Sequence, residues 1–120
     1  MKANEFVARL FMNRDVSHIV HLSTRSYAKH MALNDFYHEI IELADDFAET
    51  YQGRYGLLNK ISLVSPTKVT NIADFLQSEL DEIEKQRYAF LDKSDTALQN
   101  IVDEIVGLYL KTIYKLKYLA

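Results

Sequence analysis

Cysteine is absent from this chain of 120 residues, and turn-forming residues are scarce, with one proline and three glycines. Without cysteine the chain can form neither a disulfide framework nor a thiolate metal site, which is compatible with a reducing cytoplasm. Few positions favour a sharp turn or break a helix. The shortage of proline and glycine therefore favours a protein built from a few long helices.

Long apolar runs are also absent. No stretch reaches the roughly 20 apolar residues of a membrane span, and the first residues lack the continuous apolar core of a signal peptide. We therefore expect a cytoplasmic protein, in the host cytoplasm if it is viral, with no membrane partner. The net charge of −3 argues against non-specific binding to nucleic acid.

The residues that are present suffice for one packed core. Hydrophobic residues make up 48% of the chain, including eight tyrosines and six phenylalanines, and this length suits a single domain over residues 1–120. Apolar residues recur at steps of three and four, as the buried face of a helix requires. The pattern predicts an all-α bundle with helices at about 4–24, 27–51 and 72–90, and a fourth that extends to about Leu119.

Capping residues support these boundaries. Ser26, the Thr70-Asn71 pair and the Ser94-Asp95 pair each precede a predicted helix and belong to the residue types that cap helix N-termini. Asp15 could also cap a new helix after a break at residues 12–15, but we treat the first helix as continuous. Gly53 and Gly56 supply the stop after the second helix.

The connection between the second and third helices is long. Residues 53–70 would link them, whereas adjacent antiparallel helices usually need only two to eight residues. At about 3.3 Å per extended residue, such a link can cross the full length of a helix of about 20 residues. This favours the ferritin-like connection, a four-helix bundle with one long crossover, with room for a small extra helix in the link.

Imidazole and carboxylate groups recur along the first two predicted helices. His18 and His30 are twelve positions apart, and a D-x-x-A-E run from Asp45 to Glu49 begins fifteen positions after His30. These groups are ligands for iron, manganese or zinc. His21, one helical turn from His18, competes for the same role. The spacing therefore predicts a metal site that draws on His30, Asp45 and Glu49, joined by His18 or His21.

With these residues the chain resembles the ferritin-like superfamily, and within it the Dps-type mini-ferritins. Their ferroxidase pattern is a histidine at the end of the first helix, then a histidine, an aspartate and a D-x-x-A-E run on the second. The chain departs from it at the aspartate four residues after the second histidine, where it has Asn34, and at a usual tryptophan, where it has Ile19. The family's G-x-x-F turn is replaced by residues 23–26. Small phage-encoded proteins of unknown role are similar too.

The resemblance implies an iron-binding protein, and ferroxidase is the activity that would follow. His30 and Asp45 would lie about 22 Å apart on one helix, so a shared site requires an antiparallel copy of that helix and at least a dimer. The aromatic residues of the second helix, together with a half-apolar strip at His30, Ile41 and Ala48, also favour self-association.

Each signal has a structural alternative. A single histidine beside an apolar face is usually a packed, hydrogen-bonded residue, and carboxylates such as Asp45 and Glu49 usually form a solvated helix face. The second functional hypothesis is therefore a non-catalytic helical interaction protein, for example a phage protein that binds a host factor. No nucleophile–base signature, phosphate loop or nucleotide motif supports a hydrolase or transferase.

Overall fold

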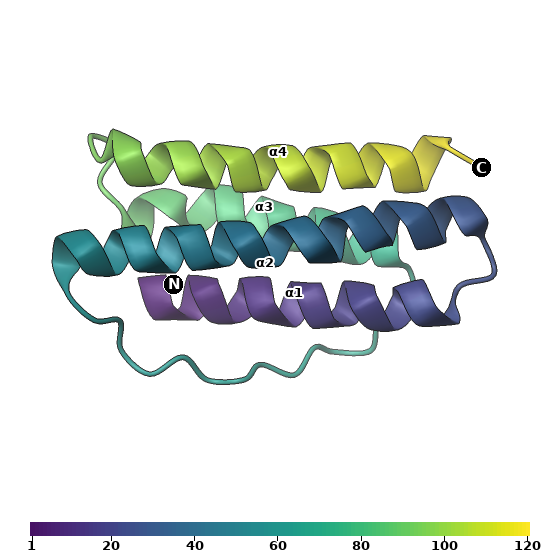
Figure 1. Ribbon diagram of the computed structural model, residues 1–120, viewed down its shortest axis with the longest axis horizontal. Helices are drawn as coiled ribbons and strands as arrows, with labels where there is room; N and C mark the ends of the chain where they lie inside the picture. Colours follow the sequence, from purple (N-terminus) through teal and green to yellow (C-terminus); the bar gives the residue numbers. More distant parts are fainter.

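Four helices account for most of the chain in a computed structural model that describes residues 1–120 (Figure 1). They are α1 (Ala3–Ser23), α2 (Tyr27–Tyr55), α3 (Ile72–Phe90) and α4 (Thr96–Tyr118), and no strand is present. The all-α four-helix bundle expected from the periodicity is confirmed. None of the helices is both long and apolar enough to cross a lipid bilayer.

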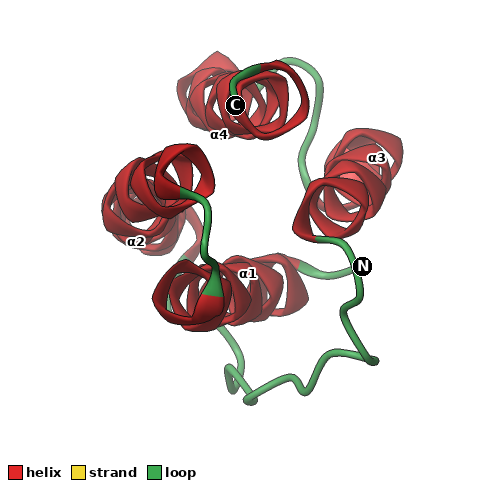
Figure 2. Cartoon of the chain, turned by 90° about the vertical axis from the view of Figure 1, so that its right-hand side faces the viewer, coloured by secondary structure: helices red, strands yellow, loops and turns green.

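The bundle contains one long crossover, between α2 and α3. Helix α1 packs beside α2 and α3, and α4 packs beside the same two helices, so α2 and α3 lie diagonally across the core (Figure 2). The link of residues 56–71 runs along the bundle outside α1 and returns the chain to the end at which α2 began (Figure 1). The crossover is therefore confirmed, but it contains no helix.

Three of the expected caps form. The side chains of Ser26, Asn71 and Asp95 accept hydrogen bonds from the backbone N–H groups of Lys29, Asp74 and Leu98, respectively. Each bond satisfies a backbone donor that the first turn of a helix leaves unpaired. These caps fix where α2, α3 and α4 begin.

Of two features predicted for the helices, the structure confirms one and corrects the other. Helix α1 is unbroken through residues 12–15, as expected. Helix α2 does not stop at Gly53 but continues to Tyr55, and Gly56 ends it with a φ of 89°. That conformation is open to glycine and strained for other residues, so Gly56 is the stop signal and Gly53 is an ordinary helical residue.

Aromatic contacts join the helices inside the bundle. The ring of Phe6 on α1 lies 4.9 Å from the rings of both Phe47 and Phe90, and the ring of Phe36 lies 5.0 Å from that of Tyr109. All of these except Phe90 are fully buried, and they belong to one continuous apolar core. The core therefore spans all four helices.

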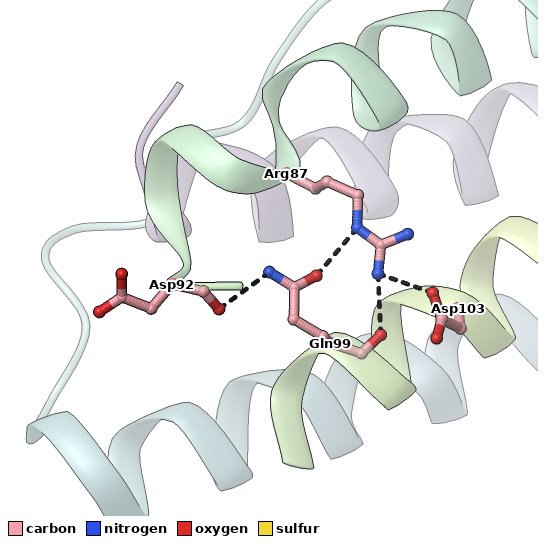
Figure 3. A network of polar contacts seen from close by, with 4 residues as sticks. All are labelled: Arg87, Asp92, Gln99 and Asp103. Carbon is pink, nitrogen blue, oxygen red and sulfur yellow. Dashed lines mark hydrogen bonds and ion pairs between the residues drawn. The ribbon is translucent and has the colours of Figure 1, made fainter. Parts of the chain in front are cut away.

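The α3–α4 hairpin is held by a polar network at its turn (Figure 3). The guanidinium of Arg87 donates to the side-chain and backbone oxygens of Gln99, at 2.9 and 3.0 Å, and to Asp103 at 2.7 Å. The amide of Gln99 in turn donates to the backbone oxygen of Asp92 at 3.2 Å. Because Gln99 is buried, its bonds to Arg87 and Asp92 satisfy groups that water does not reach.

Candidate functional site

The α1–α2 turn gathers three of the four histidines at the opposite end of the bundle from this network. His18 and His21 lie in the last two turns of α1, and His30 lies in the first turn of α2. The His21 and His30 rings stack with centroids 3.7 Å apart, and His18 is 6.0 Å from His21. We call His18, His21, His30 and the adjacent Tyr37 the histidine cluster.

His21 and His30 fasten the turn through reciprocal hydrogen bonds. Nδ1 of His21 lies 2.7 Å from the backbone oxygen of His30, and Nδ1 of His30 lies 2.8 Å from the backbone oxygen of His21. A carbonyl oxygen can only accept, so each Nδ1 carries a hydrogen and donates it. In the neutral form each Nε2 then bears the lone pair, and no hydrogen bond engages it.

His18 packs on the face of a buried tyrosine. Its ring is stacked 4.1 Å from the ring of Tyr37 at an interplanar angle of 11°, and the guanidinium of Arg14 lies 5.7 Å from the same tyrosine ring. The Tyr37 hydroxyl donates to Asn34 at 3.3 Å. Asn34, expected beside the ligand positions, is thus engaged by the histidine cluster.

The carboxylates expected to share the site lie elsewhere. Asp45 and Glu49 are exposed on α2, about 22 Å or more along the helix from His30. The strip formed by His30, Ile41 and Ala48 is half-buried.

Within one chain, no three histidine or acidic side chains are placed to hold a metal ion. Imidazoles that share one ion approach it from different directions, whereas the His21 and His30 rings are stacked on each other. The single chain therefore brings the histidines together without the acidic ligands.

Sequence reasoning missed a second polar feature, a row of polar side chains on the core-facing side of α1. Arg9 donates to the buried Glu79 of α3 at 2.6 Å, and Asn13 donates to the hydroxyl of Tyr109 on α4 at 2.7 Å. Ser17 follows one turn later, and its side chain is fully buried. The signal was available in the sequence, since Arg9, Asn13, Ser17 and His21 recur at four-residue steps.

Several atoms of this row have no hydrogen-bond partner. They are Nε of Arg9, Oδ1 of Asn13, Oγ of Ser17 and Oε1 of Glu79. A buried polar atom without a partner costs about 1–3 kcal/mol. Full burial also raises the pKa of the Tyr109 phenol well above its usual range, because the charged form would lie among apolar groups.

At the end of the bundle opposite the histidine cluster, Asp95 links the end of α2 to the start of α4. Besides capping α4, its carboxylate accepts from the Tyr55 hydroxyl at 2.5 Å and pairs with Arg54 at 3.3 Å. The hydrogen bond to Asp95 raises the pKa of the exposed Tyr55. The contacts tie the end of α2 to the α3–α4 turn and have a structural role.

Comparison with known proteins gives a family and a viral relative. Residues 21–116 match the model of a family described as "Family of unknown function (DUF5856)". An uncharacterized 14.6 kDa protein from the mobD-ri intergenic region of Enterobacteria phage T4 is 30% identical over 118 residues, which cover 98% of this chain and 87% of the relative. No solved structure matches the chain. None of these findings connects it with the mini-ferritins.

Proposed function

The chain belongs to the DUF5856 family of unknown function, and from that premise we propose that it is a phage-encoded protein that acts by binding another protein. In this proposal it catalyses no reaction, and its partner is a phage or host protein in the bacterial cytoplasm. A phage T4 relative that covers nearly the whole chain supports the viral origin. The net charge of −3 favours a protein over nucleic acid as the partner.

The observation that carries this proposal is the use of His21 and His30 in the fold. Both rings donate from Nδ1 to the backbone across the α1–α2 turn, and they stack on each other. The histidines that suggested a metal site therefore have a structural reason to be there. The acidic groups expected to join them face solvent on another part of α2.

A tagged protein isolated from its bacterial host during infection tests this proposal. We expect one partner protein in a constant molar ratio, measured by native mass spectrometry. We also expect far less than one metal ion per chain in protein purified without chelator. The complex should persist in Glu49→Ala, because that carboxylate has no ligand role in this proposal. A protein that forms no complex but is loaded with metal would contradict it.

A metal site shared by two copies is the second candidate function. It is favoured by the orientation of His21 and His30, because a ligating imidazole usually donates its other ring nitrogen to a backbone carbonyl or a carboxylate. The Nε2 atoms have no partner in the fold, and Asp45 and Glu49 are accessible to a second copy. Here the protein would be a mini-ferritin-like iron-binding dimer or larger oligomer, with ferroxidase as its activity.

Subunit exchange distinguishes this shared metal site from the protein-binding function. In a shared site, His30→Ala and Glu49→Ala each abolish iron(II) binding under anaerobic conditions, and a mixture of the two variants regains part of it through mixed dimers. Circular dichroism should show unchanged helicity in both variants. Sedimentation of a monomer at tens of micromolar, or wild-type metal content in either variant, would exclude the shared site.

A further inference from the structure

The charges of this acidic protein are unevenly distributed along the bundle. The end that carries the histidine cluster comprises residues 16–37, 66–77 and 112–120, where α1 and α4 finish and α2 and α3 begin (Figure 1). It holds five of the fourteen lysines and arginines but only two of the seventeen carboxylate side chains. We call it the basic end. The rest of the chain has nine basic and fifteen acidic side chains.

Most of the cations at the basic end are unpaired. Lys115 forms an ion pair with Asp35 at 3.7 Å. The other four, Arg25, Lys29, Lys68 and Lys117, are exposed and have no carboxylate within ion-pair distance. They come from four segments that are arranged around this end of the bundle, namely the α1–α2 turn, α2, the link and α4 (Figure 2).

Apolar and aromatic side chains are exposed at the same end. Leu22, Tyr27 and Tyr118 are 72%, 77% and 75% exposed, and Ile19, Met31, Tyr114 and Leu119 are exposed as well. These seven are half of the fourteen large hydrophobic side chains that the whole protein exposes. Apolar surface concentrated in this way, and rimmed by polar groups, is typical of an interaction site.

We infer that the basic end is the docking surface of this protein, and that it binds an acidic protein segment carrying apolar or aromatic side chains. The inference rests on the proposed function and specifies its partner. The four unpaired cations complement carboxylates, and Tyr and Leu side chains between them offer apolar contact. A bundle end of 25 × 22 Å suits an interface of up to about 600 Å² per partner, the size of transient complexes.

Two other anionic partners fit less well. Lipid-binding sites usually cluster four to eight basic residues in one segment, whereas these four cations are spread over four segments. Nucleic acid is held mainly through its phosphates and would leave the exposed aliphatic groups, such as Leu22 and Met31, unused. Both remain outcomes of the test below.

The test uses a labelled random copolymer of glutamate and tyrosine as the acidic, aromatic probe, and fluorescence anisotropy as the measurement. Wild-type protein should bind it at low salt. The double variant Lys29→Glu/Lys117→Glu should bind about tenfold more weakly, because two attractive contacts become repulsive. The control Lys85→Glu/Lys93→Glu has the same net charge but alters the opposite end, and its affinity should stay within about twofold of wild type.

A second pair of measurements isolates the apolar contribution. Leu22→Ser/Tyr118→Ser should lower affinity for the copolymer about fivefold but leave binding to polyglutamate unchanged. Equal losses in both charge variants, no binding by wild type, or tighter binding to phosphatidylserine vesicles or duplex DNA would overturn the inference. If a stoichiometric partner is isolated from cells and the Lys29→Glu/Lys117→Glu variant still binds it, the docking surface is wrong while the proposed function stands.

Discussion

At the scale of one residue, Ser17 shows that a buried polar group does not always have a hydrogen-bond partner. Its side chain is fully buried on α1, and its hydroxyl has no hydrogen-bond partner. Thr112 on α4 is also buried, but its hydroxyl donates to the backbone oxygen of Leu108 at 2.8 Å. The two hydroxyls therefore contribute to stability with opposite signs.

We expect Ser17→Ala to raise the free energy of unfolding by about 1 kcal/mol, since it removes an unsatisfied buried group and introduces a better helix former. Thr112→Val, which removes a satisfied hydroxyl of similar shape, should lower it by a comparable amount. Urea denaturation measures both changes. A destabilised Ser17→Ala would show that the hydroxyl is satisfied in solution.

Tyr109 makes stability depend on pH in alkaline solution. Its pKa is raised in the folded protein, whereas in the unfolded chain it returns to near 10. The stabilisation by the neutral phenol is complete below pH 10 and declines above it, because only the unfolded chain releases the proton. This residue alone should make stability fall by about 1.4 kcal/mol per pH unit above pH 10.

Unfolding experiments at pH 8 and above pH 10 test this expectation. Tyr109→Phe should remove this contribution to the pH dependence of the free energy of unfolding. It also destabilises the protein at pH 8, because Asn13 loses its hydrogen-bond partner. Tyr118→Phe, at an exposed position, is the matched control and should leave the slope unchanged. Identical slopes in the two variants would contradict the assignment to Tyr109.

At the scale of one element, the glycines of the helices differ in what they do. Gly107 is inside α4, has no positive φ, and a Cβ there would meet open space. Gly107→Ala should therefore stabilise the protein by about 1 kcal/mol. Gly56→Ala should destabilise it by about 1–3 kcal/mol, since alanine is strained at a φ of 89°. Thermal unfolding of both variants, followed by circular dichroism, would reveal the opposite signs.

The elements themselves could be predicted because their signals are local. Apolar periodicity predicts the number of helices, the capping residues before the last three helices predict their starts to within one residue, and the length of the link predicts the crossover. The continuation of α2 beyond Gly53 was not predicted. A helix tolerates a glycine in its last turn when the residues around it still pack against the bundle, and the glycine alone does not show whether they do.

The site was only partly predictable because it depends on how helices meet. The sequence singled out His21 and His30, but their reciprocal bonding depends on the geometry of the α1–α2 turn. Asp45 and Glu49 have the right spacing for ligands, yet spacing along one helix does not say which neighbour they face. The pairing of Asn13 with Tyr109 joins residues 96 positions apart, which no local pattern can show.

At the scale of the whole molecule, the crossover divides the chain into two hairpins. Every residue from 59 to 68 is exposed, and Lys60 and Lys68 lie within that stretch. We expect brief trypsin treatment to cut there first, because exposed segments with few contacts are the most accessible to proteases. The two fragments should remain together in gel filtration, held by the packing of α2 against α4 and of α1 against α3. Separation of the fragments would show that the link itself holds the bundle together.

The unequal charge of the two parts of the bundle also gives the molecule an electric dipole along its long axis. Such a molecule turns in the field of a charged surface, so that its cations face an anionic support even though its net charge is −3. It should therefore be retarded on a cation-exchange column at pH 7 and low salt, where a pI near 5.8 alone would send it through unretained. The same rotation would orient the protein before it touches an acidic partner. A larger fraction of encounters would then lead to binding than random collision allows, and this gain in association rate would decrease as salt screens the field.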